Sequence, residues 1–90
     1  KIRPVLVVLD TGDEDVMVAP VTTSPATTPG SVAVSDFREA GLVKPSVVRL
    51  HKIATIHKSR TLSRLGQLSP SDFSRAARLW RQVFAAWEAG

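Results

Sequence analysis

All the strand-forming segments of this chain come before residue 69, and its one long helical pattern comes after it. Turn-forming glycine, proline and aspartate residues separate four runs rich in β-branched side chains, which are Pro4–Leu9, Val16–Val21, Ser31–Val34 and Ser46–Leu50. Two weaker candidates for extended structure follow, Ile53–Ile56 and Leu62–Leu68. Short strands followed by a single terminal helix predict a small α+β domain whose strands form a partly closed antiparallel β-barrel.

The predicted helix has a clear beginning and one apolar face. Ser69-Pro70-Ser71-Asp72 supplies an N-cap serine, a proline at the first helical position and an acid that reaches back in a capping box. Apolar side chains then recur at helical spacing at Phe73, Ala76, Ala77, Trp80, Val83, Phe84 and Trp87. Such a stripe is more often core than ligand site, so we expect it to be buried, with Trp80 and Phe84 each contributing about 2–3 kcal/mol.

The 90 residues have the length of one domain, and their charges are unevenly distributed. Residues 1–48 carry four basic and six acidic side chains, whereas residues 49–90 carry eight basic and two acidic ones. This basic excess in the second part indicates an anionic partner, either nucleic acid or an acidic protein segment. A solvated basic helix face is the alternative explanation.

Composition argues against several kinds of protein. The chain has no cysteine, so disulfides and thiolate metal sites are excluded, which fits a reducing cytoplasm. Its longest apolar run, Val5–Leu9, is too short to cross a membrane. The two histidines lack the spacing of metal ligands, and Asp13-Glu14-Asp15 lacks the alternation of a calcium loop, so no metal or cofactor is predicted. Because position 1 is Lys1 rather than methionine, we expect further residues upstream in the natural protein.

Four segments resemble, in order, motifs of the PemK/MazF family of toxins from type II toxin–antitoxin systems. Lys1–Val8 is similar to the family's K/R-x-R-P-V-L-V-V opening, and Val18–Ser24 to its V-x-P-[VIL]-T-S strand end. Ser46–Leu50 and Arg64–Ser69 resemble its S-V-V-R and R-[LI]-G-x-L-S segments. The resemblance implies an SH3-like antiparallel β-barrel with a C-terminal α-helix. It also implies a cytoplasmic homodimer that cleaves single-stranded RNA (mRNA) without metal and is neutralised by a cognate antitoxin.

The sequence departs from the family pattern in two places. We expect residues 1–90 to form a single toxin-like domain that lacks the family's usual first strand ahead of Lys1. Two residues after Arg49, the plasmid-borne branch of the family has an aspartate, whereas this chain has His51. The first difference affects a loop that helps to wall the substrate groove in relatives.

Cleaving RNA without a metal requires a base for the 2′-hydroxyl proton, an acid for the leaving 5′-oxygen and cations for the charged phosphorane. By the resemblance, Arg3 is the motif arginine and Thr22 the active-site threonine. Arg49 and His51 are two residues apart, so on one strand they would point to the same face. His51 is then predicted to be the base, with Arg49 stabilising the transition state or acting as the acid. The alternative is that these side chains are solvated residues at strand ends.

Further RNA contacts are predicted at five polar or basic positions, Thr23, Ser24, Lys52, Lys58 and Arg60. The hydroxyl residues are more often turn formers when taken without the family pattern. His57 has no arginine at a matching position and is predicted to be structural or solvated.

Two other functions remain open at this point. A protein of the same fold can be a non-nuclease toxin that poisons DNA gyrase through the end of its last helix, although Trp87-Glu88-Ala89-Gly90 shows no signature of that activity. A degenerate family member that only pairs with its antitoxin is the third possibility. Retention of Arg3, Thr22 and Arg49 argues against such decay.

Overall fold

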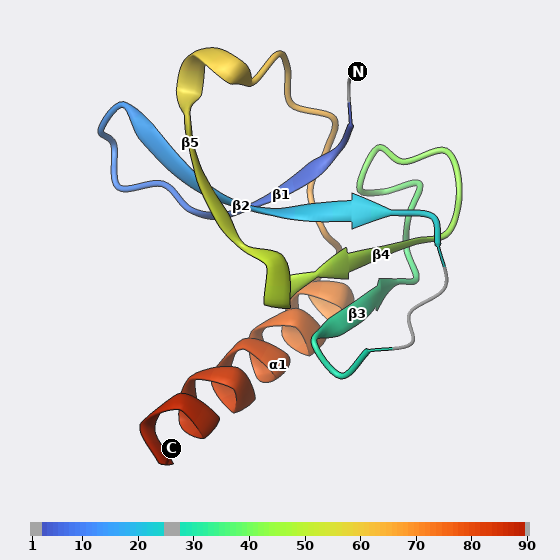
Figure 1. Cartoon of the computed structure of the whole chain (residues 1–90). Helices are drawn as coiled ribbons and strands as arrows, with labels where there is room; N and C mark the ends of the chain where they lie inside the picture. Colours follow the sequence, from blue (N-terminus) through green and yellow to red (C-terminus); the bar gives the residue numbers. More distant parts are fainter. Residues whose placement is uncertain (1–2, 25–27, 90) are drawn as a thin grey trace.

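The computed structural model describes residues 3–24 and 28–89 and shows five strands and one long helix (Figure 1). The elements in chain order are β1 (Val5–Leu9), β2 (Asp15–Thr22), β3 (Ser31–Val34), β4 (Ser46–Arg49), the 3₁₀ turn η1 (Leu50–Lys52), β5 (Ala54–His57), the 3₁₀ turn η2 (Lys58–Arg60) and α1 (Pro70–Ala89). The predicted α+β class is confirmed. Residues 62–68, left between strand and extended turn by the sequence, form neither strand nor helix.

Strand β2 organises the sheet because it pairs with three other strands, all antiparallel. One edge pairs with β1, and the other pairs first with β5 and then with β4, which in turn pairs with β3. The change of partner falls between Val18, opposite Ala54, and Val21, opposite Val48. Pro20 lies in this gap. Because neither β4 nor β5 pairs with β2 at this residue, the lack of a backbone N–H on proline does not remove a hydrogen bond from the sheet. By changing partners along its length, β2 lets the sheet curl into a half-barrel.

The core lies between one face of the curled sheet and the first turns of α1. Its buried members come from five elements and are Ala19, Val34, Val48, Leu50 and Ala76. The alternation of side chains along each strand explains why these strand residues face the core, since Ala19 and Val21 on β2 point to the same side as Val48 on β4. Within the described residues, no helix is long and apolar enough to span a membrane.

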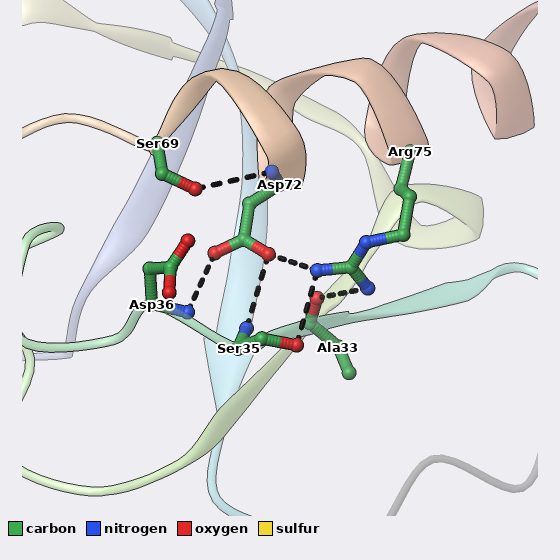
Figure 2. A network of polar contacts seen from close by, with 6 residues as sticks. All are labelled: Ala33, Ser35, Asp36, Ser69, Asp72 and Arg75. Atoms are coloured by element: carbon green, nitrogen blue, oxygen red, sulfur yellow. Dashed lines mark hydrogen bonds and ion pairs between the residues drawn. The ribbon is translucent and has the colours of Figure 1, made fainter.

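Asp72 anchors the start of α1 to the end of β3 (Figure 2). Asp72 is 2% exposed, and its carboxylate accepts hydrogen bonds from the backbone N–H groups of Ser35 (3.1 Å) and Asp36 (2.9 Å). Arg75 pairs with the same carboxylate and also donates to the Ala33 carbonyl at 3.0 Å. The helix therefore begins at a fixed place on the sheet.

The capping prediction is half right. The Ser69 hydroxyl accepts from the Asp72 N–H at 3.1 Å, as an N-cap serine should. The Asp72 side chain, however, does not reach back to residue 69, because the turn after β3 offers its buried carboxylate two backbone donors.

The prediction that the aromatic stripe is buried is wrong for the single chain. Its large members keep much of their surface exposed, from 37% at Trp80 and 50% at Phe84 to 74% at Trp87. Twenty helical residues extend about 30 Å, whereas the four-residue strand β3 that α1 packs against extends about 13 Å. The second half of α1 therefore continues beyond the sheet (Figure 1), with the Phe84 and Trp87 rings 5.6 Å apart.

Candidate functional site

Three of the predicted catalytic residues fall on one face of the sheet. Thr22 on β2 is paired with Val47 on β4, and Arg49 lies two residues further along β4, so Thr22 and Arg49 share the face opposite Val48. The β1–β2 ladder continues before Val5, since the Val21 N–H donates to the Pro4 carbonyl at 3.2 Å. The same alternation then places Arg3 opposite Thr22, again on that face. We call this the arginine face.

The spacing of the arginine face suits a phosphate. Arg3 and Arg49 are two strands apart across the sheet, and Arg49 is displaced by two residues along its strand. This corresponds to about 12 Å between their Cα atoms. Both side chains are long, and neither is enclosed, since Arg3 is exposed and Arg49 half-buried. Two guanidinium groups from separate strands can thus reach one phosphodiester between them.

Thr22 is positioned to donate a hydrogen bond on this face. It is the last residue of β2, and its hydroxyl oxygen accepts from the Ser24 N–H at 3.2 Å in a side-chain turn. Because that bond uses an oxygen lone pair, the hydroxyl proton of Thr22 remains available to an anion. Thr23 and Ser24, predicted to bind RNA, follow directly and are exposed.

The predicted alignment of Arg49 and His51 is wrong. Strand β4 ends at Arg49, and His51 lies in η1, so the two side chains are not on one strand face. The reason is a close contact with another segment: the Leu50 N–H donates to the Gly30 carbonyl at 2.9 Å, and a Cβ atom on Gly30 would lie 2.5 Å from that of His51. His51 is therefore exposed beside the start of β3, next to Lys52.

The remaining basic candidates lie at the other end of the sheet. His57 on β5 is opposite Asp15, so Lys58 and Arg60 in η2 follow the end of β2 that is about 23 Å from Thr22. Lys58 is bound there to the β1–β2 loop, with its Nζ 2.8 Å from an Asp10 carboxylate oxygen. Within one chain, the structure therefore separates these two residues from the arginine face.

His57, predicted to be structural or solvated, is exposed and takes part in a local turn. Its Nδ1 accepts from the Ser59 N–H at 3.1 Å, so the ring caps the short turn η2.

The contact between Lys58 and Asp10 predicts a titration effect. The hydrogen bond from Lys58, together with that from the Gly12 N–H, holds the pKa of Asp10 below its ordinary value. The contact therefore stabilises the native loop at pH values above the pKa that Asp10 has in the unfolded chain. This stabilisation is lost as the pH falls through the lower pKa that Asp10 has in the folded protein. Replacing Lys58 with methionine should therefore raise the pKa of Asp10, measured by NMR titration of its carboxyl carbon. An unchanged titration would show that the ion pair does not persist in solution.

Sequence reasoning missed two features of the structure. One is a pocket of about 310 Å³ at the ends of β2, β3 and β4, which includes Thr23 and Phe37 among its lining residues. The other is the Asp72–Arg75 network, whose backbone partners are more than 30 residues away in sequence. Nothing in the sequence identifies such distant partners. Across residues 3–24 and 28–89, no three histidine, aspartate or glutamate side chains gather as metal ligands.

Comparison with solved structures identifies the class of fold. The chain is similar to the Mycobacterium tuberculosis toxin MazF-mt6, with 29% identity, a TM-score of 0.79 and coverage of 92% of this chain and 86% of that one. It is also similar to a second Mtb toxin, with 30% identity, a TM-score of 0.75 and coverage of 86% and 87%. The curled antiparallel sheet with a C-terminal helix is thus the fold of MazF-type toxins.

The sequence profile of PemK-like, MazF-like toxins of type II toxin–antitoxin systems matches residues 1–84, and the chain belongs to this family. A mycobacterial endoribonuclease, solved in complex with its cognate antitoxin, shares the fold at 22% identity, with a TM-score of 0.78 over 92% of this chain and 81% of that one. No curated protein matches the sequence.

Proposed function

We propose that this toxin is an endoribonuclease that cleaves single-stranded RNA without a metal ion. The observation that carries the proposal is the arginine face, on which Thr22 of β2 and Arg49 of β4 are joined by Arg3, two residues before β1. A phosphodiester placed there receives two permanent positive charges and one hydroxyl donor, which are the groups that stabilise a developing phosphorane. A solved protein of the same fold is named an endoribonuclease.

The chemistry assigns a role to each group. The 2′-oxygen of the substrate attacks the neighbouring phosphorus, and the bond from phosphorus to the 5′-oxygen breaks, giving a cyclic phosphate and a free 5′-hydroxyl. His51 lies in η1, off the arginine face but two residues after Arg49 in the chain, and it is the proposed base for the 2′-hydroxyl proton because a neutral imidazole can accept one. Arg3 and Thr22 stabilise the phosphorane, and Arg49 donates to the leaving oxygen.

Metal independence gives a direct test. Purified protein incubated with a long, unstructured RNA should cut it equally well with and without EDTA, because the proposed charges are guanidinium groups. The cuts should leave 5′-hydroxyl ends, scored by their resistance to ligation until a kinase phosphorylates them. Loss of all cutting in EDTA, restored by adding Mg²⁺ back, would contradict the proposed chemistry.

The exposed aromatic half of α1 supports a homodimer. Phe84 and Trp87 leave an apolar surface that a small monomer seldom exposes, and a chain of this size gains stability by extending its core across a second copy. We place the dimer in the cytoplasm with mRNA as substrate and a cognate antitoxin that covers its basic surface. A monomer mass by light scattering at micromolar concentration would contradict the dimer.

The same exposed helix favours the second candidate function, a non-nuclease toxin that acts by binding a protein. The two functions respond differently to mutation. The protein-binding toxin would retain toxicity when Arg3 or Arg49 is replaced and would lose it when α1 is truncated after Trp80, whereas the ribonuclease depends on both arginines.

A further inference from the structure

A serine, a histidine and a glutamate meet at the end of the sheet that carries η2, away from the arginine face. The Ser59 hydroxyl oxygen lies 2.8 Å from Nδ1 of His57, and Nε2 of the same ring lies 4.0 Å from a Glu14 carboxylate oxygen. A hydroxyl, an imidazole and a carboxylate in this order are the groups that activate a nucleophilic serine, although here the two ring nitrogens have exchanged partners relative to serine proteases. We call these three residues the Ser59 cluster.

The backbone of the turn determines which ring nitrogen of His57 carries the proton. Nδ1 also accepts from the Ser59 backbone N–H at 3.1 Å, and a backbone N–H can only donate. In the neutral ring, Nδ1 is therefore the unprotonated nitrogen, and Nε2 carries the proton on the side of Glu14. Because Nδ1 has no proton to give, the Ser59 hydroxyl is the donor in its 2.8 Å hydrogen bond. The hydroxyl proton thus already points at a base.

We propose that Ser59 is a covalent modification site, which accepts acyl groups from small activated carboxylic esters with His57 as its general base. In this reaction the Ser59 Oγ forms a bond to the acyl carbon while its proton moves to Nδ1 of His57. The bond from that carbon to the leaving oxygen breaks, and the leaving oxygen takes the proton from His57. The products are a serine ester and a free alcohol, and no other reactant is consumed.

The Ser59 cluster is accessible, and its turn is held in place. Ser59 is exposed and the His57 side chain is 53% exposed, so a small ester can reach both groups. The Lys58 N–H donates to the Glu14 carbonyl at 2.8 Å, and its Nζ binds Asp10 at 2.8 Å. These two contacts fix η2 to the β1–β2 loop, which also carries the carboxylate of the cluster.

The openness of the cluster limits what it can do. Because water is not excluded from the two side chains, the site lacks the closed, preorganised surroundings that give an enzyme rapid turnover. We therefore expect slow acylation of each chain at Ser59 and not the turnover of an efficient esterase. The proposal is independent of the proposed function, since η2 lies at the far end of β2 from the arginine face.

The test is acetylation of the purified protein by p-nitrophenyl acetate, with the modified residues identified by peptide mass spectrometry. Ser59 should be acetylated about 100-fold faster than Ser63, an exposed serine shortly after the same turn that has no histidine two residues before it. His57→Gln should lower the rate at Ser59 to that at Ser63, because an amide is not a base. Glu14→Gln should slow the reaction less, because Glu14 only favours the reactive form of the ring.

The outcomes distinguish a reactive serine from a simple turn cap. Equal acetylation of Ser59 and Ser63 would mean that His57 only caps η2, and the proposal is overturned. The same holds if Ser59→Ala keeps the label in this peptide, because the acetyl group would then lie on His57 or Lys58. Circular dichroism melting checks the fold of each variant. Should His57→Gln melt at a much lower temperature, the comparison of Ser59 with Ser63 in the wild-type chain decides, because it needs no substitution.

Discussion

Arg3→Ala and Arg49→Ala should each reduce the rate of RNA cleavage by about 100-fold or more while the folded structure is retained. In the proposed mechanism, each substitution removes a permanent cation from the position where the phosphorane develops its charge. Neither side chain lies in the buried core, so the melting temperature should change by only a few degrees. The measurement is single-turnover cleavage of one labelled RNA, with circular dichroism melting of the same samples.

Two further variants make this test specific. Arg3→Lys keeps the charge but loses the planar pair of donors, so cleavage should fall to a value between those of wild type and Arg3→Ala. Arg78→Ala removes an equal charge from the exposed surface of α1 and should cut at nearly the wild-type rate. If Arg78→Ala loses as much activity as Arg3→Ala, the arginines act only through net charge, and the assignment of a catalytic face is wrong.

The strands and the residues of the arginine face are predictable because their signals are local. β-branched runs bounded by turn formers placed β1 to β5 within one or two residues of their observed ends. Pro20, which has no N–H to donate, lies where β2 changes partner. Arg3 and Thr22 were identified by resemblance to family motifs, and strand alternation then accounts for their shared face.

The errors all concern contacts between distant segments. The end of β4 depends on Gly30, whose carbonyl accepts from Leu50 and turns the chain so that His51 leaves the strand. The helical period shows which side of α1 is apolar, but whether that side is covered depends on the length of β3. Likewise, the serine cap follows from adjacent residues, whereas the partners of Asp72 are supplied by a turn 36 residues earlier.

The dependence of α1 on Asp72 gives the largest expected loss of stability. Asp72→Ala should lower the free energy of unfolding by about 3 kcal/mol, because it leaves the Ser35 and Asp36 N–H groups and the Arg75 guanidinium without their shared acceptor. For a domain of this size that corresponds to a fall in melting temperature of about 12–24 °C. Asp36→Ala is the matched control, since that exposed carboxylate is outside the network and only its backbone N–H takes part. Its unfolding should change by about 0.5 kcal/mol or less.

A double-mutant cycle with Arg75 distinguishes a specific network from simple loss of packing. Arg75→Ala alone leaves a buried carboxylate with less compensation for its charge and should itself be destabilising. Because the two residues share one interaction, removing both should cost less than the sum of the single changes, by about 1 kcal/mol or more. Urea unfolding followed by circular dichroism gives all four free energies. Strict additivity would mean that the carboxylate and the guanidinium stabilise the start of α1 separately, through the backbone groups of Ser35, Asp36 and Ala33 alone.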